Sequence, residues 1–295
     1  MELSWLMKLR IAAVVAIGVV LIGILAWPLA APSDPLGPVR LSNISLGSAT
    51  TLVLLAFLVG FIACFVSWPY GREIGILAVP CGLGIWAVRS GSMAQLIQLN
   101  PTLPQRQTLF TALKWEPFFW LLIVAAGFAG VLLGQKIWPK SEAAKIQTDS
   151  NHKTNKYLNV IIALVGSGFI IQLCIKILAQ DIMTSYNAHV AQPAFGQIVF
   201  AILVSFGFTA FIVKKFLNIS YIWPIIAGAL VTTLTITTYA KQDVLQHFVG
   251  RYPATFFPNV VISILPVQMV AFGTLGSIAG YWLAVRYSNH QKNGT

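Results

Sequence analysis

The sequence is poor in charged residues. Only 9% of the 295 residues are Asp, Glu, Lys or Arg, whereas 57% are hydrophobic. A soluble domain carries roughly 25% charged residues, so a chain this apolar lacks the polar groups to cover its own surface. The composition excludes a soluble globular protein and predicts an all-α polytopic membrane protein. Continuous apolar runs, without strict alternation, also argue against a transmembrane β-barrel.

Acidic residues and histidines are scarce where membrane chemistry would need them. The chain has eight acidic residues and four histidines, and none falls well inside an apolar run. Ion-coupled transporters usually carry a carboxylate at membrane depth, and haem bound between helices needs imidazole ligands. We therefore expect no proton or sodium coupling through such carboxylates, no cofactor and no metal. His189 and His247 leave only a weak alternative, an outer metal site.

Cysteine and basic residues add two further exclusions. The three cysteines, Cys64, Cys81 and Cys174, lie inside apolar runs without a C-x-x-C motif, which predicts buried thiols and no disulfide framework. The net charge of +11 would suggest nucleic acid in a soluble protein. Here the cations lie at the ends of apolar runs and in loops, where membrane topology explains them, so no nucleic-acid partner is expected.

Eight apolar runs are candidate membrane spans. They cover about 11–30, 46–68, 74–88, 117–138, 157–178, 195–213, 219–239 and 258–285. Most approach the roughly 20 residues that cross the hydrocarbon. Placing both termini in the cytoplasm puts most Lys and Arg residues inside, including the basic segment 136–157. We predict a first half at 1–138, a cytoplasmic linker at 139–156 and a second half at 157–295, in a plasma membrane of the bacterial inner-membrane type.

The two halves carry a similar pattern. "VAAGFAGVLLG" at 124–134 and "VAFGTLGSIAG" at 270–280 align without a gap, and "KWEPFF" precedes the first as "RYPATFF" precedes the second. With an even number of spans in each half, this predicts a parallel 4+4 repeat. Chance similarity between apolar segments is the alternative. The matched glycines are Gly127, Gly130 and Gly134, and Gly273, Gly276 and Gly280. Within them, Gly130 and Gly134, and Gly276 and Gly280, have the G-x-x-x-G spacing, which favours tight packing inside the bundle over a homodimer face.

Prolines and glycines also interrupt spans three and seven at matching places. Pro80 and Gly84 correspond to Pro224 and Gly228. Paired interruptions of this kind are typical of transporter binding sites, and Thr232 and Gln268 add polar groups nearby. The predicted ligand-binding set is therefore Pro80, Gly84, Pro224, Gly228, Thr232 and Gln268. Ordinary proline kinks, threonines bonded within their own helix and helix-to-helix amide bonds are the alternative.

The repeated segments before spans four and eight place a cation at an equivalent outer position. Lys114 and Arg251, with Glu116 near the first, predict an outer-face contact for an anion or a partner. Interfacial anchoring by Trp115 and its neighbours is the simpler interpretation.

Three functions follow from these features. The first is a permease-like or channel-like protein for a neutral, amphipathic or lipidic solute. The second is a non-catalytic subunit of a larger membrane complex. The third is a lipid-modifying enzyme that uses Glu116, His189, Asp243, His247 and Arg251, and it ranks last because spacing assembles no nucleophile–base pair. Expected partners are membrane lipids and either a homodimer or other membrane subunits.

Overall fold

The computed structural model describes residues 5–32, 37–137, 156–179, 190–241, 243–244, 254–255 and 260–293. Eight helices in these residues are long and apolar enough to cross a membrane, which confirms the predicted class. The described fold is helical except for a short parallel pairing of β1 (Val190–Ala191) with β2 (Ala254–Thr255). The spans are Trp5–Leu25, Leu46–Val66, Gly71–Arg89, Leu103–Ile137, Tyr157–Leu178, Phe195–Leu217, Ile222–Tyr239 and Pro266–Ser288.

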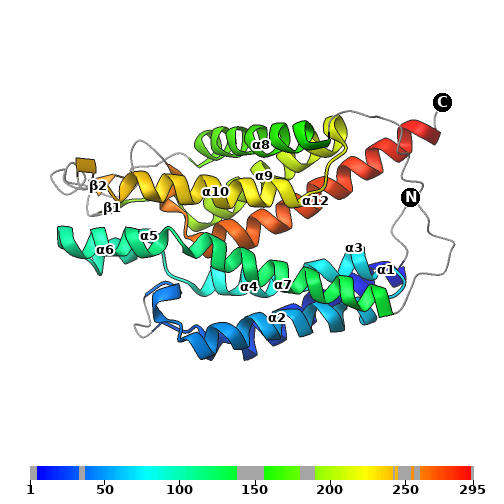
Figure 1. Cartoon of the computed structure of the whole chain (residues 1–295), viewed down its shortest axis with the longest axis horizontal. Helices are drawn as coiled ribbons and strands as arrows, with labels where there is room; N and C mark the ends of the chain where they lie inside the picture. The colour runs from blue at the N-terminus through cyan, green and yellow to red at the C-terminus, as the bar shows by residue number, and fades with distance from the viewer. Residues whose placement is uncertain are drawn as a thin grey trace.

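The spans form two groups of helices (Figure 1). One group holds α1 (Trp5–Gly18), α2 (Leu46–Val66), α4 (Ala78–Arg89) and α7 (Glu116–Ile137). The other holds α8 (Lys156–Leu178), α9 (Phe195–Leu217), α10 (Ile222–Tyr239) and α12 (Pro266–Asn293). α12 packs against α4 and α7, and so joins the groups. α1 begins and α12 ends at the same end of the bundle (Figure 1), which we call the inner end.

The first span changes its helical geometry where it meets α4. A π-helical segment, Val19–Leu25, follows α1. At its start, a Cβ atom on Gly82 would lie 2.5 Å from the Gly18 carbonyl oxygen, so the two backbones touch. Further along, the Trp86 indole Nε1 donates to the Gly23 carbonyl oxygen at 3.2 Å. A π segment displaces carbonyls from the regular ladder, and the buried indole satisfies one of them.

The third span is built from three pieces. α3 (Gly71–Ile74) leads into a 3-10 turn, Gly75–Leu77, and then into α4. Pro80 is the third residue of α4, and Pro224 is likewise the third residue of α10. In the first turn of a helix the missing N–H of proline has no intrahelical acceptor to lose, so both prolines fit without a kink. The seventh span therefore begins near Pro224, whereas the third span begins at Gly71 and changes from a 3-10 turn to an α-helix just before Pro80.

Two helix pairs make the closest contacts in the bundle, α2 with α7 and α9 with α12. In the first pair, a Cβ on Gly130 would collide with the Phe57 carbonyl oxygen. In the second, a Cβ on Gly276 would lie 2.6 Å from the Leu203 carbonyl oxygen, and one on Gly280 would collide with Gly207. Since only glycine leaves room for these backbones, the glycines set the distance between the helices.

Three short elements lie at the opposite, outer end. These are η3 (Leu41–Asn43), α5 (Met93–Gln98) and α6 (Leu103–Leu113). Ser92 and Gln95 form a capping box that starts α5, because each side chain accepts from the backbone N–H of the other. The apolar side of α6 buries Leu109, Phe110 and Leu113, and Phe110 faces Tyr239 of α10 at 6.4 Å between ring centres. This contact ties the outer end of the first group to the second.

Candidate functional site

A cavity of about 410 Å³ lies between α8 and α10 in their outer halves. Ligand sites usually enclose about 300–1,000 Å³, so this cavity is large enough for a small molecule or part of a lipid. Its lining combines four polar side chains with three aliphatic ones and contains no charged group. The lining residues are Gln172, Val231, Leu234, Thr235, Thr238, Tyr239 and Val244.

The threonines of α10 divide into two kinds. Thr232, Thr233, Thr237 and Thr238 each donate their hydroxyl to the carbonyl one turn earlier, at 2.7–3.0 Å. Thr235 makes no such bond and has no hydrogen-bond partner among the described residues, although it is only 7% exposed. A hydroxyl enclosed to this degree normally finds a partner. Its free hydrogen-bonding capacity is turned toward the cavity it lines.

Gln172 supplies a second polar group from the facing helix. Its side chain is exposed within α8 and forms no hydrogen bond with another described residue. A primary amide offers two donors and two acceptor lone pairs, and leaving them unpaired in hydrocarbon is costly. Together, Gln172 and Thr235 give the cavity one amide and one hydroxyl that are available to a neutral ligand.

The residues predicted to bind a ligand lie elsewhere, at packed helix contacts. Gly84 faces Phe272 and Leu275 of α12. From α12, Gln268 accepts from the Leu265 N–H at 3.1 Å and donates to the Ala87 carbonyl at 3.4 Å, so it links α12 to α4. The structure therefore brings Gly84 and Gln268 to one contact between the two groups.

The remaining members of that predicted set pack within α10 and its neighbours. The ring of Phe206 occupies the space where a side chain on Gly228 would lie, and it also packs against Gly273. Thr232 is bonded to the Gly228 carbonyl at 2.8 Å. Pro80 and Pro224 are both buried in the first turns of their helices. Thr232 is one turn from Thr235 and bonds to its own helix, so it does not line the cavity between α8 and α10.

Glu116 occupies an enclosed position at the start of α7. Its side chain is 2% exposed, and its Oε1 accepts from the Leu41 N–H at 3.0 Å. Arg40 and the Trp120 indole lie near this carboxyl group. The Trp120 indole Nε1 is buried and forms no hydrogen bond with a described residue. Glu116 thus fastens the segment after span one to α7, and an external partner would have to displace it.

Of the two cations predicted for the outer face, the structure describes only Lys114. Lys114 lies 5.5 Å from the centre of the Trp115 ring, and Trp115 is 60% exposed. Such an arrangement is typical of a side chain at a membrane interface. Arg251, like His189 and His247, lies outside the described residues.

An aromatic cluster continues inward from Glu116. Trp86 contacts Trp27 and Trp120 edge-to-face, each at 6.1 Å between ring centres. The Arg89 guanidinium lies 4.3 Å from the Trp27 ring. Trp86 and Trp120 are fully buried, so the cluster is a rigid core that fixes the outer ends of α4 and α7.

The predicted packing glycines all face other helices of this chain. Gly127 lies against Val79, Gly134 against Cys64 and Gly273 against Phe206. Gly130, Gly276 and Gly280 make the backbone contacts given above. Because these surfaces are occupied within one chain, a homodimer would need a different face. Within the described residues, no three His, Cys, Asp or Glu side chains gather closely enough to hold a metal.

No known family model, curated protein or solved structure matches this chain.

Proposed function

We propose that this integral membrane protein is a permease-like or channel-like protein for a neutral, amphipathic or lipidic solute. The observation that carries the proposal is the cavity between α8 and α10, with the amide of Gln172 and the hydroxyl of Thr235 free inside it. Uncharged polar groups on an apolar wall suit a ligand with a small polar part and a hydrocarbon part. The uncharged lining is the reason for proposing a neutral solute.

Transport without ion coupling through membrane carboxylates is part of this proposal. The eight spans contain only two acidic residues, Glu73 and Glu116. Glu73 lies in α3 at the inner end, and Glu116 is held by Leu41 at the outer end. Neither lines the cavity. A facilitated mechanism, driven by the gradient of the solute itself, fits this distribution.

We also propose the parallel repeat and cytoplasmic termini for this chain, in a plasma membrane of the bacterial inner-membrane type. Paired glycine contacts support the repeat. Gly130 meets the Phe57 carbonyl, and Gly276 meets the Leu203 carbonyl. Gly276 and Leu203 each lie 146 residues after their counterparts Gly130 and Phe57. A chance resemblance between apolar runs gives no reason for this contact to recur at the same offset. The basic segment 136–157 supports the cytoplasmic placement.

Reconstitution with a fluorescent phosphatidylcholine analogue tests the proposed function. Vesicles containing the protein are treated with dithionite, which reduces only probe molecules in the outer leaflet. We expect the wild type to expose the inner-leaflet probe without an ion gradient, and the Q172L/T235V variant to lose most of this activity. The variant should unfold no more easily than the wild type, because it removes two unpaired polar groups from an apolar setting.

The control variant is T233V/T237V, which changes two hydroxyls of the same helix that do not line the cavity. It should translocate the probe like the wild type. If wild-type vesicles show no translocation, and native mass spectrometry of the gently extracted protein finds a stoichiometric protein partner, the complex-subunit alternative replaces this proposal. Turnover of the lipid instead of its movement would favour the enzyme alternative.

A further inference from the structure

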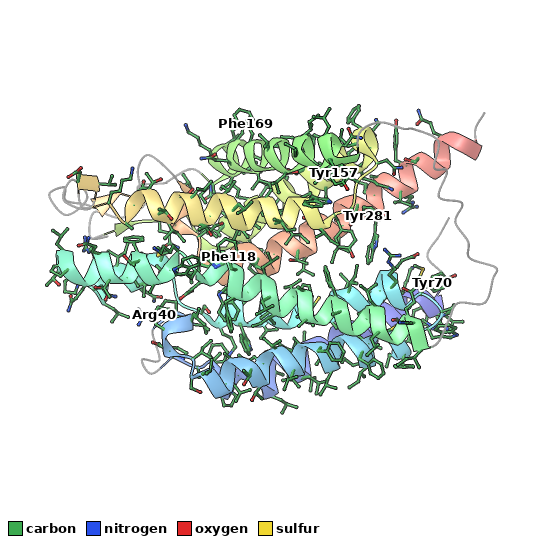
Figure 2. The ribbon with its side chains drawn as sticks, in the orientation of Figure 1. Arg40, Tyr70, Phe118, Tyr157, Phe169 and Tyr281 are labelled. Atoms are coloured by element: carbon green, nitrogen blue, oxygen red, sulfur yellow. The ribbon has the colours of Figure 1, made fainter. Side chains whose placement is uncertain are left out.

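Aromatic and charged side chains from both helix groups meet at the inner end of the bundle. Tyr221, just before α10, and Tyr281, on α12, contact edge-to-face with 5.3 Å between ring centres. Phe128 of α7 adds a third ring, 6.0 Å from Tyr221. Figure 2 labels Tyr281 at this part of α12, beside the helices of the other group. The rings therefore bridge the two groups close to where the spans end.

Two cations approach these tyrosines from different helices. The Lys214 Nζ atom, in the last turn of α9, lies 5.1 Å from the Tyr281 ring centre and 2.6 Å from the Asn218 Oδ1 atom. Arg72 of α3 is exposed, acts electrostatically on both tyrosine hydroxyls and forms no ion pair with a described residue. Glu73 is also close to Tyr281 and has its own interactions. The cluster keeps an excess of positive charge.

The tyrosine hydroxyls complete a set of hydrogen-bond donors. Burial raises the pKa of Tyr221 to about 12, although the nearby Arg72 charge acts in the opposite direction. The phenol therefore stays protonated at neutral pH and can donate a hydrogen bond. The cluster thus combines a guanidinium, an ammonium and a phenol, the donor types that bind the oxygens of a phosphate group.

Exposed apolar residues lie on the same two helices. Ile222 is 41% exposed and follows Tyr221 in sequence, and Leu283 is 60% exposed on α12, two residues after Tyr281 and on a different side of that helix. A soluble phosphate has no use for such surface, whereas a phospholipid places acyl chains there while its head group stays at the interface. Basic pockets between spanning helices at a cytoplasmic surface commonly hold anionic lipid head groups.

We propose that Arg72, Lys214, Tyr221 and Tyr281 form a binding site for the head group of an anionic phospholipid at the inner end of the contact between the two helix groups. The site is separate from the cavity between α8 and α10, and it does not depend on the proposed transport activity. A lipid held there would contact α3, α9, α10 and α12 together. It would thus stabilise the association of the two groups from the inner leaflet.

Native mass spectrometry in detergent tests the site, with phosphatidylglycerol as the anionic probe and phosphatidylcholine as the neutral one. Each basic side chain near an anionic surface contributes about 1 kcal/mol to lipid attraction. The R72Q/K214Q variant should therefore weaken phosphatidylglycerol binding by roughly tenfold or more. The matched control K136Q/K215Q also removes two cations from inner helix ends but leaves the cluster intact, and it should bind within about twofold of the wild type.

A second variant keeps the test decisive if R72Q/K214Q does not fold. Y221F/Y281F retains both rings and all charges, and it should still weaken phosphatidylglycerol binding several-fold through the lost hydroxyls. Equal weakening by K136Q/K215Q, or wild-type binding of phosphatidylcholine as tight as that of phosphatidylglycerol, would overturn the proposal. So would protection of the delipidated protein against heat by inorganic phosphate equal to that given by the lipid, because the site would then serve a soluble anion.

Discussion

Replacing Gly276 with alanine is the most direct test of how closely the helices approach. A Cβ atom at this position would lie 2.6 Å from the Leu203 carbonyl oxygen and 3.1 Å from the Leu203 Cα. Comfortable carbon–oxygen contacts begin at about 3.3 Å. The two helices would therefore have to separate by about 0.7 Å at this point, and the obstructing atoms belong to a backbone that has no alternative rotamer.

The energetic cost follows from this separation. Inserting a methyl group into a packed interior costs about 1–3 kcal/mol, and a rigid backbone neighbour places the change at the upper end. A gap of 0.5–1 Å also removes about a quarter to a half of the dispersion energy along the separated surfaces. Alanine favours a helix over glycine by about 1 kcal/mol, which offsets part of the loss. We expect a net loss of about 2 kcal/mol in the free energy of unfolding.

Unfolding in mixed micelles with increasing dodecyl sulfate measures this loss, followed by the fluorescence of the nine tryptophans. The matched control is Gly166→Ala on α8, where an added Cβ would meet no atom within 4 Å. Gly166→Ala should leave the stability unchanged or raise it by up to about 1 kcal/mol. Gly130→Ala should lose at least as much stability as Gly276→Ala, because its Cβ would collide with the Phe57 carbonyl oxygen at the contact between α2 and α7.

Equal stability of Gly276→Ala, Gly166→Ala and the wild type would refute the close approach of α9 and α12. A large loss for both alanine variants would also count against the reasoning, because the control has space for the new methyl group. The intermediate case is Gly134→Ala, whose Cβ would lie 3.0 Å from the Cys64 Cβ, a side-chain atom that has some freedom to shift. Its loss should fall between those of Gly276→Ala and Gly166→Ala.

Two further substitutions test the outer end of the first helix group in the same unfolding assay. Glu116→Ala should destabilise the protein by about 1–3 kcal/mol because it leaves the Leu41 N–H without its acceptor. Glu116→Gln keeps an acceptor there and should lose less stability. Equal losses for the two variants would show that the hydrogen bond at 3.0 Å is not the cause. Trp86→Phe should lower the free energy of unfolding by about 2 kcal/mol, since it removes the hydrogen bond to the Gly23 carbonyl and leaves a void between Trp27 and Trp120. An unchanged unfolding midpoint would contradict the role of Trp86 as the hydrogen-bond donor to the π-helical segment.

Span positions could be predicted from the sequence because hydrocarbon thickness fixes the length of an apolar run. The span predicted at 157–178 is observed at Tyr157–Leu178. The span predicted at 117–138 is observed at Leu103–Ile137, which is longer because it includes α6 before α7. The first span is displaced: it was expected at 11–30 and is observed at Trp5–Leu25. Lys8 and Arg10 lie within α1, since long cationic side chains at the end of a span reach the interface while their backbone stays helical.

The candidate site was harder to predict, because it depends on which way each polar side chain faces. The run "TTLTITT" at 232–238 indicates that α10 carries hydroxyls, but only the structure separates Thr235 from the four threonines bonded to their own helix. The partner of Glu116 could not be predicted either. Glu116 accepts from the backbone N–H of Leu41, which is 75 residues away, and a backbone donor is not indicated by the type of residue that carries it.

The proposed repeat allows the contact that contains the cavity to be compared with its counterpart in the first half. Under that repeat, α1 and α4 of the first half correspond to α8 and α10 of the second. The contact between α1 and α4 is closed: Gly18 and Gly82 bring the backbones together, and Trp86 bonds to Gly23. The contact between α8 and α10 instead leaves a half-open cavity with two unpartnered polar groups. Packing alone would favour the closed form in both halves, because unpaired polar groups cost free energy. The open form in the second half therefore calls for a compensating interaction, which a neutral ligand would supply under the proposed function.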